Sequence, residues 1–586
     1  MTGDVVELFG QLQISARMFA VDGELEAEGL AATAQGSTDE YFAVIDDLTR
    51  QLLLHAVGPA GEYDRLAART TDSLSALKAY LEGAAELRAE RYRSAFAAFQ
   101  RAVRIDSTFA LAWYGMFWAG AWPGLMEWEQ AVEATRQAVR YSGRLPPRVQ
   151  EVLKANSAII HGDLAEGERL SRAVLTRYPN YPDAWYALGF ALWHWNPFHG
   201  RPISEAFVTY KRCLSLEPDN SHFQYAGALI AALEGDWSRF DSLTRVVETR
   251  PEMALSWRAI RAFGAGSEAE QTQVLAEASQ LADWQPLPAG RYVALFAGDI
   301  AGGAELVSLA ILDSLPLEAR GIARVQVAEF MLAVGGWRAA QHELAQVATF
   351  NPTLATLYRA LWATSPWVPT TRSELSALHD SVASWDASSL KPSVTHTGTR
   401  AHDLLGPQLR LYVLGRLSVR LGDHESALGY ADQLEQMVSP RRSPSYGFDR
   451  AQTIRATVLR DRGRLAEALE LLGSQMRRLN IQYLFDAPFY VHPEERFLHG
   501  EIMVGLERYE EALRWYETAG QVGFGEPSYV AMAHLRRAEV YERLGDTKNA
   551  ARQYEKFIRY WQDADPEFQP WVGAARRALE RLSPDA

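Results

Sequence analysis

The sequence predicts a mainly α-helical protein: an α-solenoid in which helical hairpins stack into a right-handed superhelix, with a small α+β segment at its amino end. The chain has 586 residues, more than one hydrophobic core can serve, so it forms either several domains or one elongated repeat array. Its residues are 48% hydrophobic and include 17 tryptophans, enough apolar surface for a long core. A helical pattern with a period of about 34 residues favours the repeat array.

The first sixty residues differ from the rest because they carry a strand pattern. Residues 11–19 alternate apolar and polar side chains, the VDG sequence at 21–23 is a turn signal, and residues 24–32 can return as a partner strand. A lone β-hairpin is only marginally stable in water, and residues 40–55 supply an amphipathic helix on which it can lie. We therefore predict a partial α+β unit over residues 1–60.

Small and aromatic residues recur at fixed spacing from about Ser75 onward. In the first clear copy, Gly83 and Ala95 are small, whereas Tyr92 and Phe99 are large. Small residues let the helices approach closely, and large ones fill the gaps between them. One hairpin cannot bury its apolar face alone, so the copies must stack. The best further copies contain Trp185, Leu188, Gly189, Ala206 and Tyr210; Trp337, Ala340 and Leu344; Gly500, Tyr509, Ala512 and Tyr516; and Ala538, Gly545, Ala550 and Tyr554.

Two irregular stretches interrupt the pattern. Between residues 251 and 323 the period is poor although helical patterns persist, which favours degenerate hairpins. Residues 384–399 are rich in Ser, Thr and Pro, a composition typical of a loop, which here could serve as a hinge. We therefore predict a first solenoid arm over 70–383 and a second over 400–586. The second arm ends in a helix at 569–582 whose polar outer side suits a cap.

The repeat pattern resembles the tetratricopeptide repeat, and three stretches resemble one family that carries it. This family is the carboxy-terminal TolB-like and tetratricopeptide region of bacterial serine/threonine kinases and related transcriptional regulators. The end of its TolB-like domain is similar to QLQISARMFAVDGELEAEGLAAT at 11–33. Its repeats resemble TDSLSALKAYLEG at 71–83 with YRSAFAAFQRAVRIDSTFALAW at 92–113, and its closing signature resembles ERLGDTKNAARQYEKFIRYWQDADPEFQPWVGAARRALERL at 542–582.

The resemblance implies an architecture and not kinase activity. A kinase needs an H-R-D catalytic loop and a D-F-G metal ligand, and neither motif occurs in the sequence. The kinase domain is therefore absent from these residues. The family relation implies a fragment of a larger protein, or a gene product that has lost its effector domain.

Charge and composition restrict the partners. Lys and Arg number 59 against 73 Asp and Glu, a net charge of −14, which repels phosphate backbones and anionic lipid. We therefore expect no nucleic-acid partner and no membrane insertion. The single cysteine, Cys213, excludes an internal disulfide. No signal peptide or membrane span is visible, so we expect a cytoplasmic location for the chain as written, and an extracytoplasmic one if it belongs to a larger membrane kinase.

Aromatic residues are the first candidate for a ligand site. On the first helix of such a hairpin, positions 2, 5, 9 and 12 face the concave groove, and counting places five aromatic side chains there. An aromatic groove can bind an extended or helical apolar peptide through large contact areas. The alternative is that these rings fill the superhelix core. The five residues are Tyr114, Trp118, Tyr186, Phe190 and Trp193.

A second candidate groove lies in the second arm, where Arg416, Arg450 and Arg460 count onto groove positions. Guanidinium groups there could grip a carboxylate or a phosphopeptide. The alternative is a solvated charged face. The carboxylate clamp of chaperone-binding tetratricopeptide proteins is not implied, because its lysine and asparagine positions hold Tyr412 and Arg416 in this sequence.

No spacing nominates a metal, cofactor or catalytic site. His492 and His499, with Glu495 between them, could share one face of an unbroken helix, but zinc-protease spacings are absent. His194 and His199 lie in an insertion, where loop residues are expected. The sequence therefore predicts a non-catalytic scaffold that binds a protein or peptide of unknown identity in its concave groove. The alternative is the sensory or regulatory arm of a bacterial kinase or transcriptional regulator whose effector domain is missing.

Overall fold

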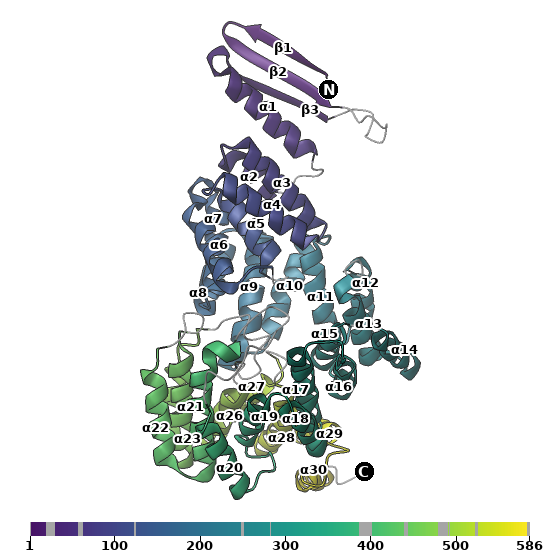
Figure 1. Cartoon of the computed structure of the whole chain (residues 1–586), viewed down its shortest axis with the longest axis vertical. Helices are drawn as coiled ribbons and strands as arrows, with labels where there is room; N and C mark the ends of the chain where they lie inside the picture. The colour runs from purple at the N-terminus through teal and green to yellow at the C-terminus, as the bar shows by residue number, and fades with distance from the viewer. Residues whose placement is uncertain are drawn as a thin grey trace. The chain divides into compact units, whose positions relative to one another are not determined.

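The computed structural model describes residues 2–18, 30–56, 62–121, 125–247, 251–281, 283–385, 401–438, 444–478, 490, 493–521 and 526–582 (Figure 1). The chain divides into two compact units, Met1–Ile160 and His161–Ala586, which we describe separately. The fold is the predicted tetratricopeptide-type α-solenoid with a small amino-terminal sheet. Within the described residues, no helix combines the length and the apolar character that a membrane span requires.

The amino-terminal unit begins with a three-stranded antiparallel sheet in the order β1-β2-β3. Its strands are Thr2–Leu8, Gln11–Met18 and Leu30–Ser37, and helix α1 (Tyr41–Ala56) follows. Val44 and Leu48 of α1 pack on the apolar side chains of β2 and β3. The predicted hairpin and its covering helix are thereby confirmed, although the return strand begins at Leu30. The predicted turn at 21–23 lies outside the described residues.

Strand β1 was not predicted from the sequence. All seven of its residues are exposed, so no alternation of buried and exposed positions marks it as a strand. Its pairing with β2, from Thr2 opposite Arg17 to Leu8 opposite Gln11, holds it in place. The first strand is therefore specified by a partner and not by its own pattern.

Six helices complete the described part of this unit, and neighbours along the chain pack as hairpins. A methyl group at Gly83 would lie 2.9 Å from the Phe99 ring, so the two helices meet where the small residue was predicted to permit it. The helices are α2 (Glu62–Thr70), α3 (Leu74–Arg88), α4 (Tyr92–Ile105), α5 (Ala110–Gly120), α6 (Trp128–Arg140) and α7 (Pro147–Ile160), with a 3-10 turn η2 (Ser142–Arg144).

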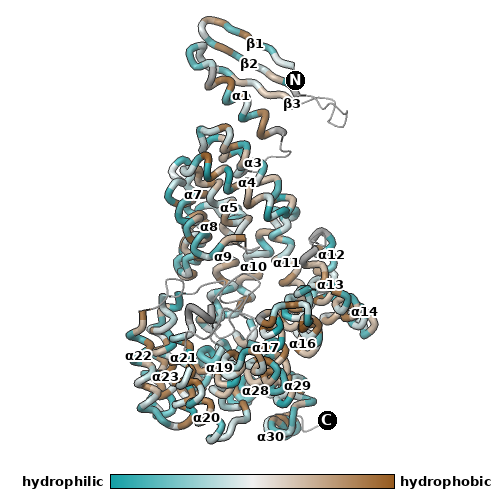
Figure 2. The backbone as a smooth tube through the Cα atoms, in the orientation of Figure 1, coloured by the Kyte–Doolittle hydropathy of each residue, from teal (hydrophilic) through white to brown (hydrophobic). Residues whose placement is uncertain are grey.

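The first half of the second unit continues the run of paired helices. Figure 2 shows hydrophobic and hydrophilic residues alternating along them, as expected for helices with one buried face. The repeat period is poor over residues 251–323. There the chain forms two helices of ordinary length, α13 and α14, and then two short helices separated by a π-helical turn, η4. The elements are α8 (Leu164–Arg177), α9 (Pro182–Trp195), η3 (Asn196–His199), α10 (Ser204–Leu216), α11 (Ser221–Glu234), α12 (Trp237–Val247), α13 (Pro251–Ala265), α14 (Glu268–Ser279), α15 (Pro286–Tyr292), η4 (Val293–Ala297) and α16 (Ile300–Ser308).

The second half repeats the same hairpin contact. A methyl group at Gly500 would lie 2.5 Å from the Tyr516 ring, as Gly189 would approach Tyr210 in the first half. The predicted pairing of a small with an aromatic residue thus holds in both halves. The helices are α17 (Leu317–Ala333), α18 (Trp337–Ala348), α19 (Pro352–Ala363), α20 (Arg372–Ala383), α21 (Ala401–Leu421), α22 (His424–Gln436), α23 (Tyr446–Asp461), α24 (Leu465–Gly473), α26 (Pro493–Gly505), α27 (Tyr509–Glu517), α28 (Pro527–Arg543), α29 (Thr547–Tyr560) and α30 (Gln569–Leu582).

The last helices return to the middle of this unit. Helix α28 packs against α17, and the Trp561 indole N–H donates to the Ala333 carbonyl at 2.9 Å. One hydrophobic core includes residues from Val325 to Ala578, so helices on both sides of segment 384–399 share it. That segment lies outside the described residues from 386 onward, and the boundaries of the two arms remain a prediction. The return of the chain places α17 and α19 beside α26 and α28, and residues of these helices line the cavities described below.

Candidate functional site

Helices α21, α23, α26 and α28 line a groove in the second unit, and each is the first helix of a hairpin. The groove contains a cavity of about 300 Å³ and a smaller neighbouring cavity of about 50 Å³. Arg460 and Glu501 line both. We call this region the arginine groove and define it by its charged lining residues, Arg416, Arg420, Arg460, Glu494, Glu501, Arg536, Glu539 and Arg543.

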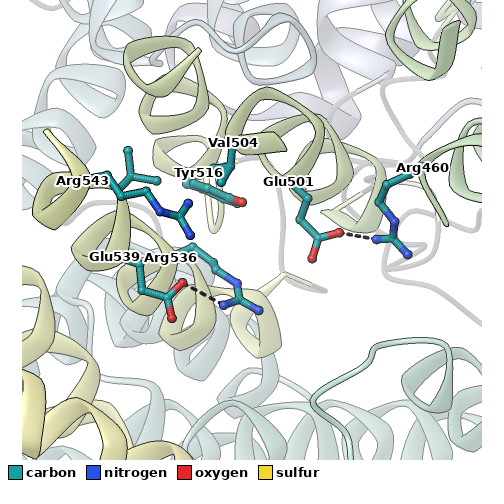
Figure 3. Close-up of a pocket in the computed structure, with 8 residues that line it drawn as sticks. Arg460, Glu501, Val504, Tyr516, Arg536, Glu539 and Arg543 are labelled. Carbon is teal, nitrogen blue, oxygen red and sulfur yellow. Dashed lines mark hydrogen bonds and ion pairs between the residues drawn. The ribbon is translucent and has the colours of Figure 1, made fainter. Parts of the chain in front are cut away.

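Figure 3 shows the larger cavity, with the Tyr516 side chain between Arg543 and Glu501. Arg460 forms ion pairs with Glu501 and, at 2.7 Å, with Asp461. Arg536 pairs with a glutamate three residues later on the same helix, at 2.8 Å. Two of the five arginines are therefore neutralised within the groove wall.

The other three arginines have no carboxylate partner among the described residues. Arg416 is 9% exposed and donates to the Thr457 hydroxyl at 3.2 Å. Arg420 donates to two backbone carbonyls at and just after the end of α19, at 2.7 and 2.5 Å. Arg543 is exposed at the rim. A guanidinium group stays protonated in proteins, so five arginines against three glutamates leave the groove with an excess of two positive charges.

Burial and neighbouring charges shape the electrostatics of the groove. Burial lowers the pKa of Arg420, and the nearby Arg416 lowers it further. Burial also acts to lower the pKa of Arg460, but Glu501 and Asp461 outweigh it, and this pKa is raised. Burial raises the pKa of the Tyr516 hydroxyl, and Glu501 adds to the rise. Near neutral pH the groove thus presents guanidinium charges and a neutral phenol, a combination suited to an anionic group.

The structure places two of the three arginines predicted for the groove, Arg416 and Arg460, in one cavity. Arg450 is fully buried. Its guanidinium forms an ion pair with Glu494 at 2.5 Å and lies 4.5 Å from the centre of the Tyr412 ring. Arg450 therefore holds Glu494, which lines the cavity, from behind the groove wall.

Sequence counting missed Arg420, Arg536 and Arg543, which correspond to positions 13, 6 and 13 of their repeats. Each residue advances about 100° around a helix, so these positions lie about 20° to 40° from the nearest counted one. An arginine stem is long enough to bring its charged end across that angle. A count that admitted flanking positions for Arg and Lys would have found all three.

The aromatic candidates fall in both units. Tyr114 and Trp118 belong to the amino-terminal unit, where Tyr114 is buried and its hydroxyl accepts from the Asn156 side-chain amide at 3.0 Å. The other three candidates, Tyr186, Phe190 and Trp193, are half-buried in the second unit. Of these, Trp193 lines a cavity of about 250 Å³ with Phe207, Leu233, Leu295 and Phe296.

The histidines considered as metal ligands surround an arginine. His199 and His499 each place Nε2 3.3 Å from the Arg477 guanidinium, and Glu495 Oε1 lies 3.3 Å from the same group. Arg477 thus occupies the centre of this set. Burial, together with the charge of Arg477, lowers the pKa of His199 to about 4 and that of His499 to about 3. No group of three metal-ligating side chains is placed to hold an ion within the described ranges, and His492 lies outside them.

Comparisons with known proteins do not identify the family of this chain. No family model matches it, and no curated protein matches its sequence. Among solved structures, yeast Tom70 matches at 12% identity and a TM-score of 0.31, over 87% of this chain and 97% of Tom70. The P58(IPK) TPR domain matches at 14% identity and a TM-score of 0.17, over 74% of this chain and 99% of that domain. A human IFIT1 dimer with PPP-AAAA matches at 11% identity and a TM-score of 0.29, over 86% of this chain and 95% of IFIT1.

The expected absence of a nucleic-acid partner is corrected by this comparison. IFIT1 is a matching chain whose structure contains an oligonucleotide, so the exclusion that we drew from the net charge of −14 was wrong. The physical reason is that net charge averages over the whole surface. The arginine groove carries an excess of positive charge although the chain as a whole is acidic.

Proposed function

We propose that this protein is a non-catalytic interaction scaffold whose arginine groove binds an acidic segment of a partner protein. The observation that carries the proposal is the set of three arginines, Arg416, Arg420 and Arg543, that line the groove without a carboxylate partner among the described residues. A carboxylate side chain of a bound peptide supplies the missing acceptor, with the planar geometry that guanidinium groups prefer.

An acidic peptide fits this groove better than a nucleic acid. Glu501 and Glu539 stand among the arginines in the larger cavity and would repel a continuous row of phosphates. A peptide can set its acidic residues against the arginines and its apolar residues against the groove's rings, such as Phe497 and Tyr529. The mixture of charges and rings therefore favours separate carboxylates over an evenly charged backbone.

The test is fluorescence anisotropy with labelled octaglutamate, and octaglutamine as its uncharged analogue. We expect octaglutamate to bind the full chain, and Arg416→Gln combined with Arg543→Gln to weaken binding at least tenfold. The control is Arg552→Gln, since Arg552 is an exposed arginine on α29 outside the groove. Unchanged affinity in the double variant, with its helical circular dichroism intact, would exclude the groove as the site. Labelled oligo(A) is measured in parallel, and tighter binding that is lost in the same variant would assign the groove to nucleic acid instead.

The regulatory-arm alternative is proposed from the family resemblance. Its support is that the amino-terminal sheet with α1 is compatible with a remnant of a TolB-like domain. In that case binding in the groove would control an effector domain that these residues do not contain. The test is genome context: a fused or adjacent reading frame for a kinase or winged-helix domain supports this alternative, and its absence from related genomes opposes it.

The aromatic residues are proposed as a second, apolar contact surface. Trp193 supports this best, because it lines a cavity with four other apolar side chains. A pull-down from cell lysate compares the parent chain with variants in which Tyr186, Phe190 and Trp193, and separately Tyr114 and Trp118, are changed to Ala. A partner lost in soluble, helical variants supports the surface, and a partner that is retained shows that the rings belong to the core.

A further inference from the structure

A second cavity, of about 50 Å³, lies next to the arginine groove and has the opposite chemistry. It shares Glu494, Trp367 and Tyr529 with the smaller cavity of the groove. We call it the Glu329 cavity and define it by its acidic and aromatic lining residues, Glu329, Tyr358, Trp362, Trp367, Tyr412, Glu494 and Tyr529. None of the described residues that line it is a lysine, arginine or histidine.

Glu329 is a buried carboxyl group that forms no ion pair with any of the residues that the structure describes. It is 4% exposed, and Oε2 accepts one hydrogen bond, from the Gln326 side-chain amide at 3.2 Å. Gln326 in turn accepts from Arg291 Nε at 2.9 Å, so this arginine is linked to Glu329 through the glutamine. Glu494, the other acid in the cavity, is held by Arg450 and by the Tyr412 hydroxyl.

The walls of the cavity are aromatic. Tyr358, Trp362, Trp367, Tyr412 and Tyr529 are each less than a tenth exposed. Trp367 meets Tyr529 edge to face, with ring centres 5.0 Å apart, so the rings are fixed by one another. The faces of aromatic rings attract cations, most strongly for tryptophan and where water is excluded. Several rings around one unpaired carboxyl group favour a ligand that is both positively charged and partly apolar.

We propose that the Glu329 cavity binds an alkylammonium group, with Glu329 as its counter-ion and the surrounding rings as its apolar and cation–π contacts. Its volume of about 50 Å³ is several times the space that one water molecule requires, enough for an ammonium group and the start of its alkyl chain. A divalent metal is disfavoured because it needs several oxygen ligands, and the other acid among the described lining residues, Glu494, is already paired with Arg450. The ammonium group can come from a lysine side chain of a bound protein or from a free alkylamine.

The protonation of Glu329 supplies a specific signature of binding. Burial raises its pKa to about 8, and Arg291 acts in the opposite direction. In the empty cavity the carboxyl group is therefore mainly protonated at pH 7.5. When an ammonium ligand binds and stabilises the carboxylate, Glu329 must lose its proton to solvent. The other titratable groups near it are Arg291 on α15, Tyr358 on α19, Tyr412 on α21, Glu494 on α26 and Tyr529 on α28.

The experiment is calorimetric titration of the full chain with n-butylammonium chloride at pH 7.5, in two buffers with different heats of ionisation. We expect saturable binding with release of about three quarters of a proton, the fraction bound at pH 7.5 by a carboxyl group with a pKa of about 8. Binding of n-butanol, the uncharged counterpart of the probe, should be at least tenfold weaker. Glu329→Gln should lower butylammonium affinity at least tenfold and abolish proton release. Glu305→Gln is the matched control, because Glu305 is exposed on α16, and it should behave as the parent chain does.

Two results would overturn the proposal: no binding of butylammonium to the parent chain, or equal binding to the Glu329→Gln variant. Titration with the amide of Nα-acetyl-lysine separates the two sources of the ammonium group. Binding of both probes indicates a lysine side chain, and binding of butylammonium without the lysine amide indicates a free amine. The inference does not depend on the proposed function, since octaglutamate binding is measured with other variants and Glu329→Gln is expected to preserve it.

Discussion

The arginine groove and the Glu329 cavity are neighbours in the same unit, but their buried ionisable groups differ: the arginines stay charged, whereas the glutamate is neutralised by a proton. In the groove, Arg416 remains charged at 9% exposure and Arg420 turns to backbone carbonyls. In the cavity, Glu329 accepts one amide hydrogen bond and becomes protonated near neutral pH, because burial raises its pKa to about 8.

The difference follows from the intrinsic acidity of the two groups. An arginine cannot lose its proton in a protein, so burial obliges the fold to supply acceptors for its donors. A carboxyl group can escape the cost of burial by taking up a proton. The arginine groove therefore keeps its charge at any physiological pH, whereas Glu329 becomes charged when a cation binds beside it.

The largest effect on stability is expected from removing Arg450, the arginine that supports both cavities. Arg450→Ala leaves Glu494 without its ion-pair partner and deletes a side chain that is fully buried. Loss of one member of a buried pair typically costs about 3–5 kcal/mol, and we expect a destabilisation of that order in urea unfolding followed by circular dichroism. Arg552→Ala, an exposed change on α29, should alter stability by less than about 0.5 kcal/mol. Equal effects of the two substitutions would contradict the role assigned to Arg450.

A change at Glu329 should raise the stability of the protein at alkaline pH instead of lowering it. The folded-state pKa of about 8 lies above the ordinary glutamate value of 4.5, so the folded state binds the extra proton, and parent stability falls as pH rises from about 4.5 to about 8. Glu329→Gln does not titrate. It should therefore match the parent near pH 4 and exceed its stability at pH 9, by on the order of 2–4 kcal/mol. Thermal unfolding across this pH range measures the difference, and a variant that is less stable than the parent at pH 9 would argue against a buried, unpaired acid.

A smaller effect is expected from the glycine beneath the groove. A methyl group at Gly500 would lie 2.5 Å from the ring of Tyr516, so Gly500→Ala must move a groove residue and should cost about 1–3 kcal/mol. Gly473→Ala is the matched control, because no atom lies within 4 Å of a methyl group there and alanine is the better helix former. Stability and octaglutamate affinity should both fall for Gly500→Ala, and neither should fall for Gly473→Ala.

The smallest expected difference between the two cavities is in how salt changes their ligand affinities. Raising NaCl from about 0.05 to about 0.5 M shortens the range of interactions between exposed charges but screens buried ones much less. Octaglutamate, which reaches the exposed Arg543, should lose about fivefold in affinity. Butylammonium, which pairs with a carboxyl group that is 4% exposed, should change by less than about twofold. Identical salt dependence for the two ligands would show that both bind at the surface.

Several features were predictable from local sequence. The pairing of Gly83 with Phe99 and of Gly500 with Tyr516 is visible as a fixed spacing, because two helices can approach closely only where one of them lacks a side chain. Counting along single helices also identified Arg416 and Arg460, since the helical period determines which residues share a face. The exposed strand β1 was not predictable in this way, because its hydrogen bonds come from a partner and none of its side chains is buried.

The sequence by itself determined the helical hairpins, their stacking and the presence of arginines on one face. Only the tertiary structure decided that Glu329 and Trp367 lie with Glu494 and Tyr529 around one cavity, and that Arg477 stands between His199 and His499. Local periodicity records which side of a helix is buried, whereas the identity of a distant neighbour depends on small rotations that accumulate over many stacked hairpins. Which side chains meet in a cavity therefore depends on the stacking of many hairpins and cannot be predicted from a short stretch of the sequence.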